Sequence, residues 1–416
     1  INANDIETNK IRGDNGISYE TETIRLKQAF EEKGFLVNSI IITQFNNQEK
    51  AIRFEKYLDN LSIDHHRTYD INGYPNDINH ILSADGFGKN DYTKTERPLV
   101  VVTGPGPGSG KMATCLSQMY LDHEMGKRSS YAKFETFPIW NLGLMHPVNM
   151  AYEAATANLN DINMIDPYHL EKYGTLAVNY NRDVEAFPVL KRMLEKIMGQ
   201  APYSSPTDMG VNMAGFCIID EDAAIKASED EIIRRYYNAL VDYRFAKESY
   251  TSVEKIQTLM SNLDLKPEDR RVAVLARDKE KITGKESFAI ELKDGRVMRG
   301  KKSKLFSAPA ACILNALKKL GNIDDDILLL SPHIIEPVSN LKTKSLGEKE
   351  PSLSINEMLI ALAISATTNP LTHMAIEEIK NLKNLDAHST VILNDSEKSE
   401  LRKLGLNFTQ DPVFTK

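Results

Sequence analysis

The sequence predicts an α/β protein with a P-loop-like parallel sheet domain, a helical hairpin insertion and a C-terminal α/β domain. Strand and helix patterns alternate through the first half of the chain, and a glycine-rich loop at 103–111 joins an apolar run to a helical pattern. Further on, a β-hairpin pattern follows two capped helices. A chain of 416 residues is long enough for about two to three domains, and we expect them at 1–200, 201–266 and 267–416.

The first domain opens with alternating helices and strands. The spacing of apolar residues predicts helices over 24–34, 47–61 and 112–126 and strands over 38–44, 65–71 and 97–104. The last of these strands contains Leu99 and three valines in succession, which is typical of a strand buried on both faces of a parallel sheet. We therefore expect βαβ units that end in the glycine-rich loop.

Two helices with capping-box spacing form the expected hairpin at 201–266. Ser228 is followed three residues later by Glu231, and Thr251 is followed at the same spacing by Glu254. An apolar stripe along the first helix predicts that the hairpin packs on a larger body.

The C-terminal domain begins with a β-hairpin pattern at 287–300, where Asp294 and Gly295 suit a type I′ turn. The pattern then predicts a helix at 308–321, a strand at 326–331, a helix capped by Ser354 and Glu357, a helix after Pro370 and a strand at 389–394. This alternation predicts a separate α/β unit.

The composition indicates a soluble globular protein, because 41% of the residues are hydrophobic and 26% are charged. A net charge of -7 argues against nucleic acid or an anionic membrane as a partner. The longest apolar stretch, 358–366, is too short to span a bilayer. Cys115, Cys217 and Cys312 lack zinc-ligand spacing and cannot form a disulfide framework, which favours a reducing cytoplasm.

The loop from Thr103 to Lys111 has the composition of a phosphate-binding loop. Glycines let backbone N–H groups approach a phosphate, a helix N-terminus adds a positive dipole, and a lysine adds charge. The predicted phosphate-binding residues are Gly106, Gly108, Ser109, Gly110 and Lys111. The match to the P-loop pattern is imperfect because Pro105 replaces a glycine and Met112 replaces the magnesium-binding hydroxyl residue, for which Thr114 is the nearest substitute. The alternative is a tight turn that only closes a strand–helix junction.

An asparagine-rich stretch from Asn141 to Arg182 is a candidate lining for a cleft beside this loop, with Asn179 and Arg182 as ligand contacts. Asp166 follows a short apolar run and is a candidate magnesium ligand, with Glu135 as its competitor. The alternative for each residue is a helix cap, a turn or an ion pair.

Zinc chemistry is not expected. His123 and Glu124 are not followed by the second histidine that a zinc protease motif requires. No serine-nucleophile elbow is present either.

The runs TGPGPGSGKMATCLSQMY, KFETFPIWNL, HPVNMAYEAATANLNDINMIDPYHLEKYG, AVNYNRDVEAFPVLKR and SPTDMGVNMAGF closely resemble a bacterial family known as domain of unknown function 1846. The resemblance extends along essentially the whole chain. It implies a cytoplasmic bacterial protein with a further N-terminal segment before Ile1. The C-terminal order of elements also resembles a deaminase-like sandwich without its zinc motif.

From the loop we expect a nucleotide- or phosphate-binding protein that acts as a phosphotransferase or NTPase, with ATP or another nucleotide and magnesium as cofactors. Its partner would then be a small phosphate-bearing ligand. The alternative is a non-catalytic assembly or interaction protein in which the glycine loop is architectural. A homo-oligomer is expected under either hypothesis.

Overall fold

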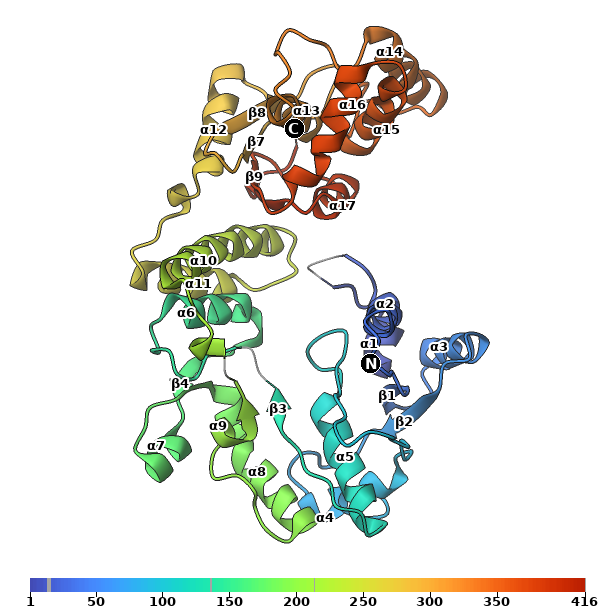
Figure 1. Ribbon diagram of the computed structural model, residues 1–416, viewed down its shortest axis with the longest axis vertical. Coiled ribbons are helices and arrows are strands. Elements are labelled where there is room, and N and C mark those ends of the chain that lie inside the picture. Colours follow the sequence, from blue (N-terminus) through green and yellow to red (C-terminus); the bar gives the residue numbers. More distant parts are fainter. Residues whose placement is uncertain (13–15, 135–136, 213, 416) are drawn as a thin grey trace. The chain divides into compact units, whose positions relative to one another are not determined.

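A computed structural model describes residues 1–12, 16–134, 137–212 and 214–415. The chain is a mixed α/β protein with small sheets, and it divides into two compact units. One unit combines residues 1–144 with 163–217, and the other combines 145–162 with 218–416. The helical hairpin is therefore grouped with the C-terminal residues (Figure 1). None of the helices in the described ranges is both long and apolar enough to cross a membrane.

The first unit begins around a parallel pair of strands. Its first elements are α1 (Ala3–Glu7), α2 (Tyr19–Glu32), β1 (Ile40–Phe45), α3 (Glu49–Asn60), β2 (His65–Tyr69), α4 (Ile78–Ile81) and the 3₁₀ turn η1 (Phe87–Lys89). β1 pairs in parallel with β2, and α3 covers them with Phe54 and Leu58, which are both buried. This confirms the first two helix–strand alternations that the sequence predicts.

The rest of the first unit is mostly helical. It contains α5 (Lys111–Glu124), β3 (Lys133–Phe134), β4 (Asn163–Ile165), α7 (Pro167–Tyr173), β5 (Val178–Tyr180), α8 (Asn181–Met198), α9 (Pro206–Met209), β6 (Gly210–Val211) and η3 (Ala214–Phe216). β3 pairs in parallel with β6, and β4 pairs with β5 in antiparallel orientation. Leu116 of α5 and Leu194 of α8 belong to one buried core.

The predicted strand at 97–104 is wrong. The structure assigns no strand there, and the side chains of Leu99 and Val101 are 80% and 76% exposed. A strand needs a hydrogen-bonded neighbour, and both edges of β1 are already occupied. β2 lies along one edge, and Asn2 bridges Thr43 on the other.

The second unit contains a helical part and a four-stranded sheet. The helical part consists of α6 (Pro147–Ala155), η2 (Ala157–Leu159), α10 (Glu221–Arg244) and α11 (Tyr250–Asn262). Figure 1 shows α10 and α11 side by side, and their buried residues share one core with α6. The expected hairpin is present, but Asp220 and Ser249 cap its helices instead of Ser228 and Thr251.

The C-terminal sheet has the strand order β10-β9-β7-β8. Its elements are η4 (Pro267–Asp269), α12 (Arg271–Thr283), β7 (Ser287–Glu291), β8 (Val297–Lys301), α13 (Ala308–Leu320), α14 (Pro332–Asn340), η5 (Leu341–Ser345), α15 (Ile355–Ala366), α16 (Pro370–Glu377), η6 (Glu378–Leu382), β9 (Asp386–Ser389), α17 (Asp395–Lys403) and β10 (Asn407–Gln410). β9 and β10 are parallel, whereas β7 is antiparallel to both β8 and β9.

Three details of this domain differ from the sequence prediction. The hairpin turn is not type I′, because only Gly295 has a positive φ and a type I′ turn requires two such residues. Residues 326–331 form no strand, since Ser365 and Thr372 donate their hydroxyls to the Leu329 carbonyl. The predicted strand at 389–394 forms earlier, as β9. The capping box of Ser354 with Glu357 is confirmed.

Candidate functional site

The glycine-rich loop ends directly at the N-terminus of α5. Gly110 is the N-cap residue with φ +82°, and Gly108 has φ +76°, so both adopt the left-handed conformation that favours glycine. Within the described ranges, the backbone N–H groups of Gly108, Ser109, Gly110 and Lys111 donate to no protein acceptor. The loop therefore presents consecutive donors at the positive end of a 14-residue helix.

Close packing explains why two positions in the loop are glycine. A Cβ on Gly106 would lie 2.3 Å from the Tyr19 hydroxyl oxygen, and a Cβ on Gly110 would lie 2.7 Å from the Thr43 Oγ1. Both distances are too short for non-bonded atoms. Tyr19 of α2 and Thr43 of β1 therefore leave no room for a side chain at these two positions.

Side chains of the first unit hold the carbonyl groups of the loop. Arg12 Nη1 donates to the Pro105 carbonyl at 2.6 Å, and Asn2 Nδ2 donates to the Gly108 carbonyl at 3.1 Å. The Ser109 carbonyl accepts a hydrogen bond from Thr43 Oγ1 at 3.0 Å. With its carbonyls fixed in this way, the loop keeps its N–H groups available. The buried Ser109 hydroxyl donates to the Gly106 carbonyl, so a ligand would meet the backbone of Ser109 and not its side chain.

Lys111 is the cationic residue of the loop. Its Nζ donates to the Gly106 carbonyl at 3.1 Å, so the side chain folds back over the loop. The pKa of Lys111 is lowered first by desolvation and then by the nearby positive charge of Lys133. Lys133 is a residue that the sequence analysis missed, because a single lysine on a two-residue strand belongs to no motif.

Lys133 connects the loop to part of the asparagine-rich stretch. Its ammonium donates to the Tyr180 hydroxyl and to the Asp183 carboxylate. Lys133 and Arg182 also contact the Tyr180 ring, at 4.7 and 5.4 Å from its centroid. Arg182 therefore shares the Tyr180 ring with Lys133. A half-buried Thr114 lies on the first turn of α5.

Two other predicted site residues have structural partners. Asn179 is 2% exposed, and its Oδ1 accepts a hydrogen bond from the Tyr180 N–H. Asp166 is fully buried at the N-terminus of α7, where its Oδ1 accepts from the N–H groups of Tyr168 and His169. Its Oδ2 accepts from both the N–H and the hydroxyl of Thr207. These hydrogen bonds show that Asp166 is the N-cap residue of α7.

No group of three or more metal-ligating side chains is found among the described ranges. Glu135, the alternative carboxylate, lies outside these ranges. The prediction of a magnesium ligand at Asp166 stays a prediction.

Ser205, His169 and Asp208 have the residue types of a hydrolase triad but not its geometry. Ser205 Oγ and Asp208 Oδ1 lie 3.1 and 3.6 Å from the same imidazole nitrogen, Nδ1. A catalytic triad requires the nucleophilic hydroxyl and the orienting carboxylate on opposite nitrogens of the histidine. Ser205 is also fully buried, and its Oγ caps α9.

Two family models match the chain end to end. The model described as domain of unknown function DUF1846, N-terminal, covers residues 1–264, and its C-terminal counterpart covers residues 268–416. The chain belongs to the DUF1846 family. The boundary between the two DUF1846 models lies beside the expected boundary at 266, although the hairpin helices pack with the C-terminal unit.

Curated relatives carry the family designation UPF0371. A UPF0371 protein of Streptococcus pneumoniae strain CGSP14 is 55% identical over 414 residues, which is 100% of this chain and 84% of the relative. A UPF0371 protein of Streptococcus uberis has the same identity and coverage. These names state no ligand and no reaction, so the chemistry of the DUF1846 loop has to be argued from its geometry.

Proposed function

We propose that the loop at 104–111 binds the phosphate group of a small ligand, and that the ligand is a nucleotide. The observation that supports this proposal best is the run of backbone N–H groups from Gly108 to Lys111, which have no acceptor among the residues that the structure describes. Unpaired donors at a helix N-terminus are the usual protein site for a phosphate oxygen. The Lys111 ammonium would exchange its bond to the Gly106 carbonyl for a bond to the phosphate.

Lys133 supports the same proposal because its ammonium adds positive charge near Lys111. Arg182 contacts the same Tyr180 ring as Lys133. A second phosphate of a nucleotide would extend toward them. ATP with magnesium is therefore the first ligand to test, with Thr114 as the hydroxyl of the first α5 turn. Phosphoryl transfer or NTP hydrolysis is the activity that such a P-loop-like site would support, because this chemistry depends mainly on positioning and charge.

The proposal is tested by thermal unfolding with ATP and magnesium, and separately with inorganic phosphate. A ligand at about 100 times its Kd should add about 2.7 kcal/mol to the free energy of unfolding. We expect Lys111→Ala to weaken binding by about tenfold or more, since a charge-assisted hydrogen bond contributes about 1.5–3 kcal/mol. Lys89→Ala, which removes an exposed lysine of the same unit, is the matched control.

Absence of stabilisation by either ligand would favour the alternative of an assembly protein with an architectural loop. Equal affinity of the wild type and Lys111→Ala would show that the ligand binds elsewhere.

A further inference from the structure

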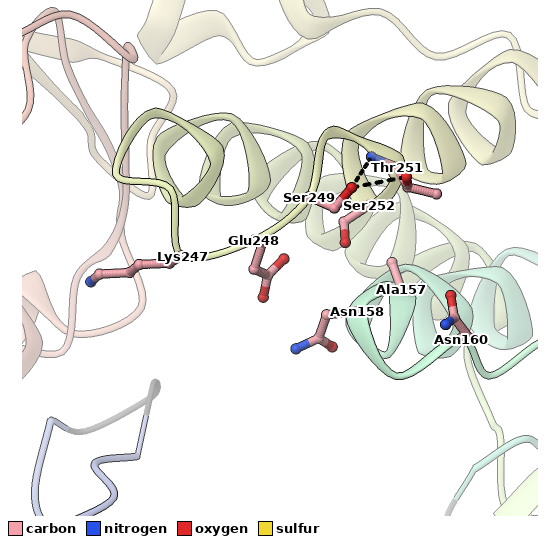
Figure 2. A pocket seen from close by; sticks show the side chains of 8 residues that line it. All are labelled: Ala157, Asn158, Asn160, Lys247, Glu248, Ser249, Thr251 and Ser252. Carbon is pink, nitrogen blue, oxygen red and sulfur yellow. Dashed lines mark hydrogen bonds between the residues drawn. The ribbon is translucent and has the colours of Figure 1, made fainter.

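The second unit contains a polar cavity that the proposed function does not use. It has a volume of about 470 Å³ and lies between η2 and the connection from α10 to α11. Its lining residues are Ala157, Asn158, Asn160, Lys247, Glu248, Ser249, Thr251 and Ser252 (Figure 2). This volume is within the usual range for small-molecule sites. All of these residues except Ala157 have polar side chains, so the cavity suits a ligand with several polar groups.

Glu248 supplies the negative charge of the cavity. Burial raises the pKa of its carboxyl group, and the nearby Asp242 carboxylate raises it further, whereas the neighbouring polar side chains of Ser252 and Asn158 oppose the shift. Figure 2 shows the Glu248 carboxylate and the Asn158 amide reaching into the same open space. Among the described residues, no Lys, Arg or His nitrogen lies within 4.0 Å of this carboxylate. The charge of Glu248 is therefore not neutralised by a cationic side chain of the described residues.

Positive charge and hydrogen-bond donors lie on other parts of the lining. Lys247 extends away from Glu248 in Figure 2, and its ammonium lies 5.4 Å from the centroid of the Phe245 ring. The hydroxyls of Ser249 and Thr251 lie 3.0 Å apart at the start of α11. The cavity therefore has an anionic part and a separate part that can donate to an anion.

We propose that this cavity binds a free α-amino acid with a small or polar side chain. The ammonium group would contact the Glu248 carboxylate and the Asn158 carbonyl oxygen. The α-carboxylate would accept a hydrogen bond from the one hydroxyl of the bonded Ser249–Thr251 pair that keeps a free proton, and another from a reoriented Lys247. The ligand side chain is small or polar because Ala157 is the only apolar lining residue.

Other ligand classes fit the lining less well. A phosphate would meet the Glu248 charge, and a simple amine would not use the Ser249 and Thr251 hydroxyls. A sugar would lack the aromatic surface on which its ring could pack, since no lining residue is aromatic. This proposal is independent of the phosphate loop.

The test is calorimetric titration of the full chain with each standard amino acid. The tightest binder is then compared with its analogue that lacks the amino group, its analogue that lacks the carboxylate, and glucose. We expect the amino acid to bind and each of the three comparison compounds to bind at least about tenfold more weakly.

Glu248→Gln preserves the shape of the side chain and removes its charge, so it should weaken binding by about tenfold or more. Glu254→Gln is the matched control, because Glu254 is an exposed residue of α11 that does not line the cavity. The wild-type panel decides the question even if Glu248→Gln fails to fold. The proposal is overturned if no amino acid binds at millimolar concentration, if the amine analogue or glucose binds as tightly, or if Glu248→Gln keeps full affinity.

Discussion

At the residue scale, the loop depends on positions where a side chain would disturb the backbone. Gly110 combines a left-handed φ of +82° with direct contact to Thr43, whereas Gly126, at the end of α5, has a similar φ of +71° and open space around it. The sequence analysis identified these two glycines as the residues that flank the helical pattern at 112–126. It did not reveal the contact with Thr43, because that contact joins residues far apart in the chain.

Gly110→Ala should therefore destabilise the protein more than Gly126→Ala. Each substitution forces a left-handed alanine, which costs about 1 kcal/mol, but only Gly110→Ala also places a Cβ against Thr43. We expect an additional loss of about 1–3 kcal/mol in the free energy of unfolding, measured by urea denaturation. Equal losses for the two variants would mean that Thr43 does not confine the loop.

A second residue-scale prediction concerns His388, which is fully buried in β9. Its Nδ1 lies 2.8 Å from Thr409 Oγ1, its Nε2 lies 3.3 Å from Asp411 Oδ1, and the Tyr237 ring packs against it. Arg277 binds the same Asp411 carboxylate. Burial lowers the pKa of His388 below its ordinary value of 6.5, and the nearby Asp411 carboxylate only partly opposes this effect.

Because the folded pKa is lowered, the unfolded chain takes up a proton first as the pH falls. The contribution of neutral His388 to stability is therefore present above about pH 6.5 and is lost as the pH decreases below it. The unfolding free energy of the wild type should fall between about pH 7 and about pH 5, and His388→Gln should flatten this dependence. The control is His373→Gln, which changes an exposed histidine. If the unfolding free energy of His388→Gln depended on pH as that of the wild type does, buried His388 would not be the cause of the pH dependence.

At the element scale, patterns that involve neighbouring residues were the most predictable. The capping box of Ser354 with Glu357 forms, because both groups belong to one helical turn. Ser228 has the same spacing to Glu231, but its hydroxyl donates to the Ala224 carbonyl inside α10, since Asp220 caps the helix two turns earlier. The strand predicted at 97–104 does not form for a longer-range reason, because Asn2 already pairs with the edge of β1 that does not face β2.

Arg270 joins three elements of the C-terminal unit. It is 5% exposed and donates to Thr409 Oγ1, the Asp386 carboxylate and the carbonyls of Ala387 and Asn407. Removing one partner of a buried ionic network costs about 3–5 kcal/mol, and we expect Arg270→Met to lose an amount of this size in chemical denaturation. Its neighbour Arg271 is more exposed, so Arg271→Met should lose about 1 kcal/mol or less. Similar losses in the two variants would contradict a special role for the buried arginine.

At the scale of the whole molecule, the boundaries of the family models and of the compact units differ. The C-terminal family model begins at residue 268, but the second unit also contains α6, α10 and α11. The sequence predicted the boundary near 266 from Lys266 and Pro267, which end the hairpin. It could not predict that Tyr237 of α10 would donate to the Pro267 carbonyl and pack against His388, because these contacts cross the boundary.

We expect the fragment 268–416 to fold, because its main hydrophobic core lies entirely between Phe288 and Leu406. It should be less stable than the fragment 218–416, which retains α10 and the Tyr237 contacts. Thermal unfolding of the two fragments measures the difference. Equal melting temperatures would mean that the hairpin does not stabilise the sheet.

The central claim is that the backbone N–H groups at the start of α5 bind phosphate. The most direct measurement is a nuclear magnetic resonance titration of protein labelled with ¹⁵N-glycine, using ATP with magnesium and, separately, inorganic phosphate. The account predicts that the amide signals of Gly108 and Gly110 shift with saturation and that the signal of Gly126 does not. If these two signals stay unchanged while ATP or phosphate is bound, or if neither ligand shifts any glycine signal, the proposed loop function is contradicted.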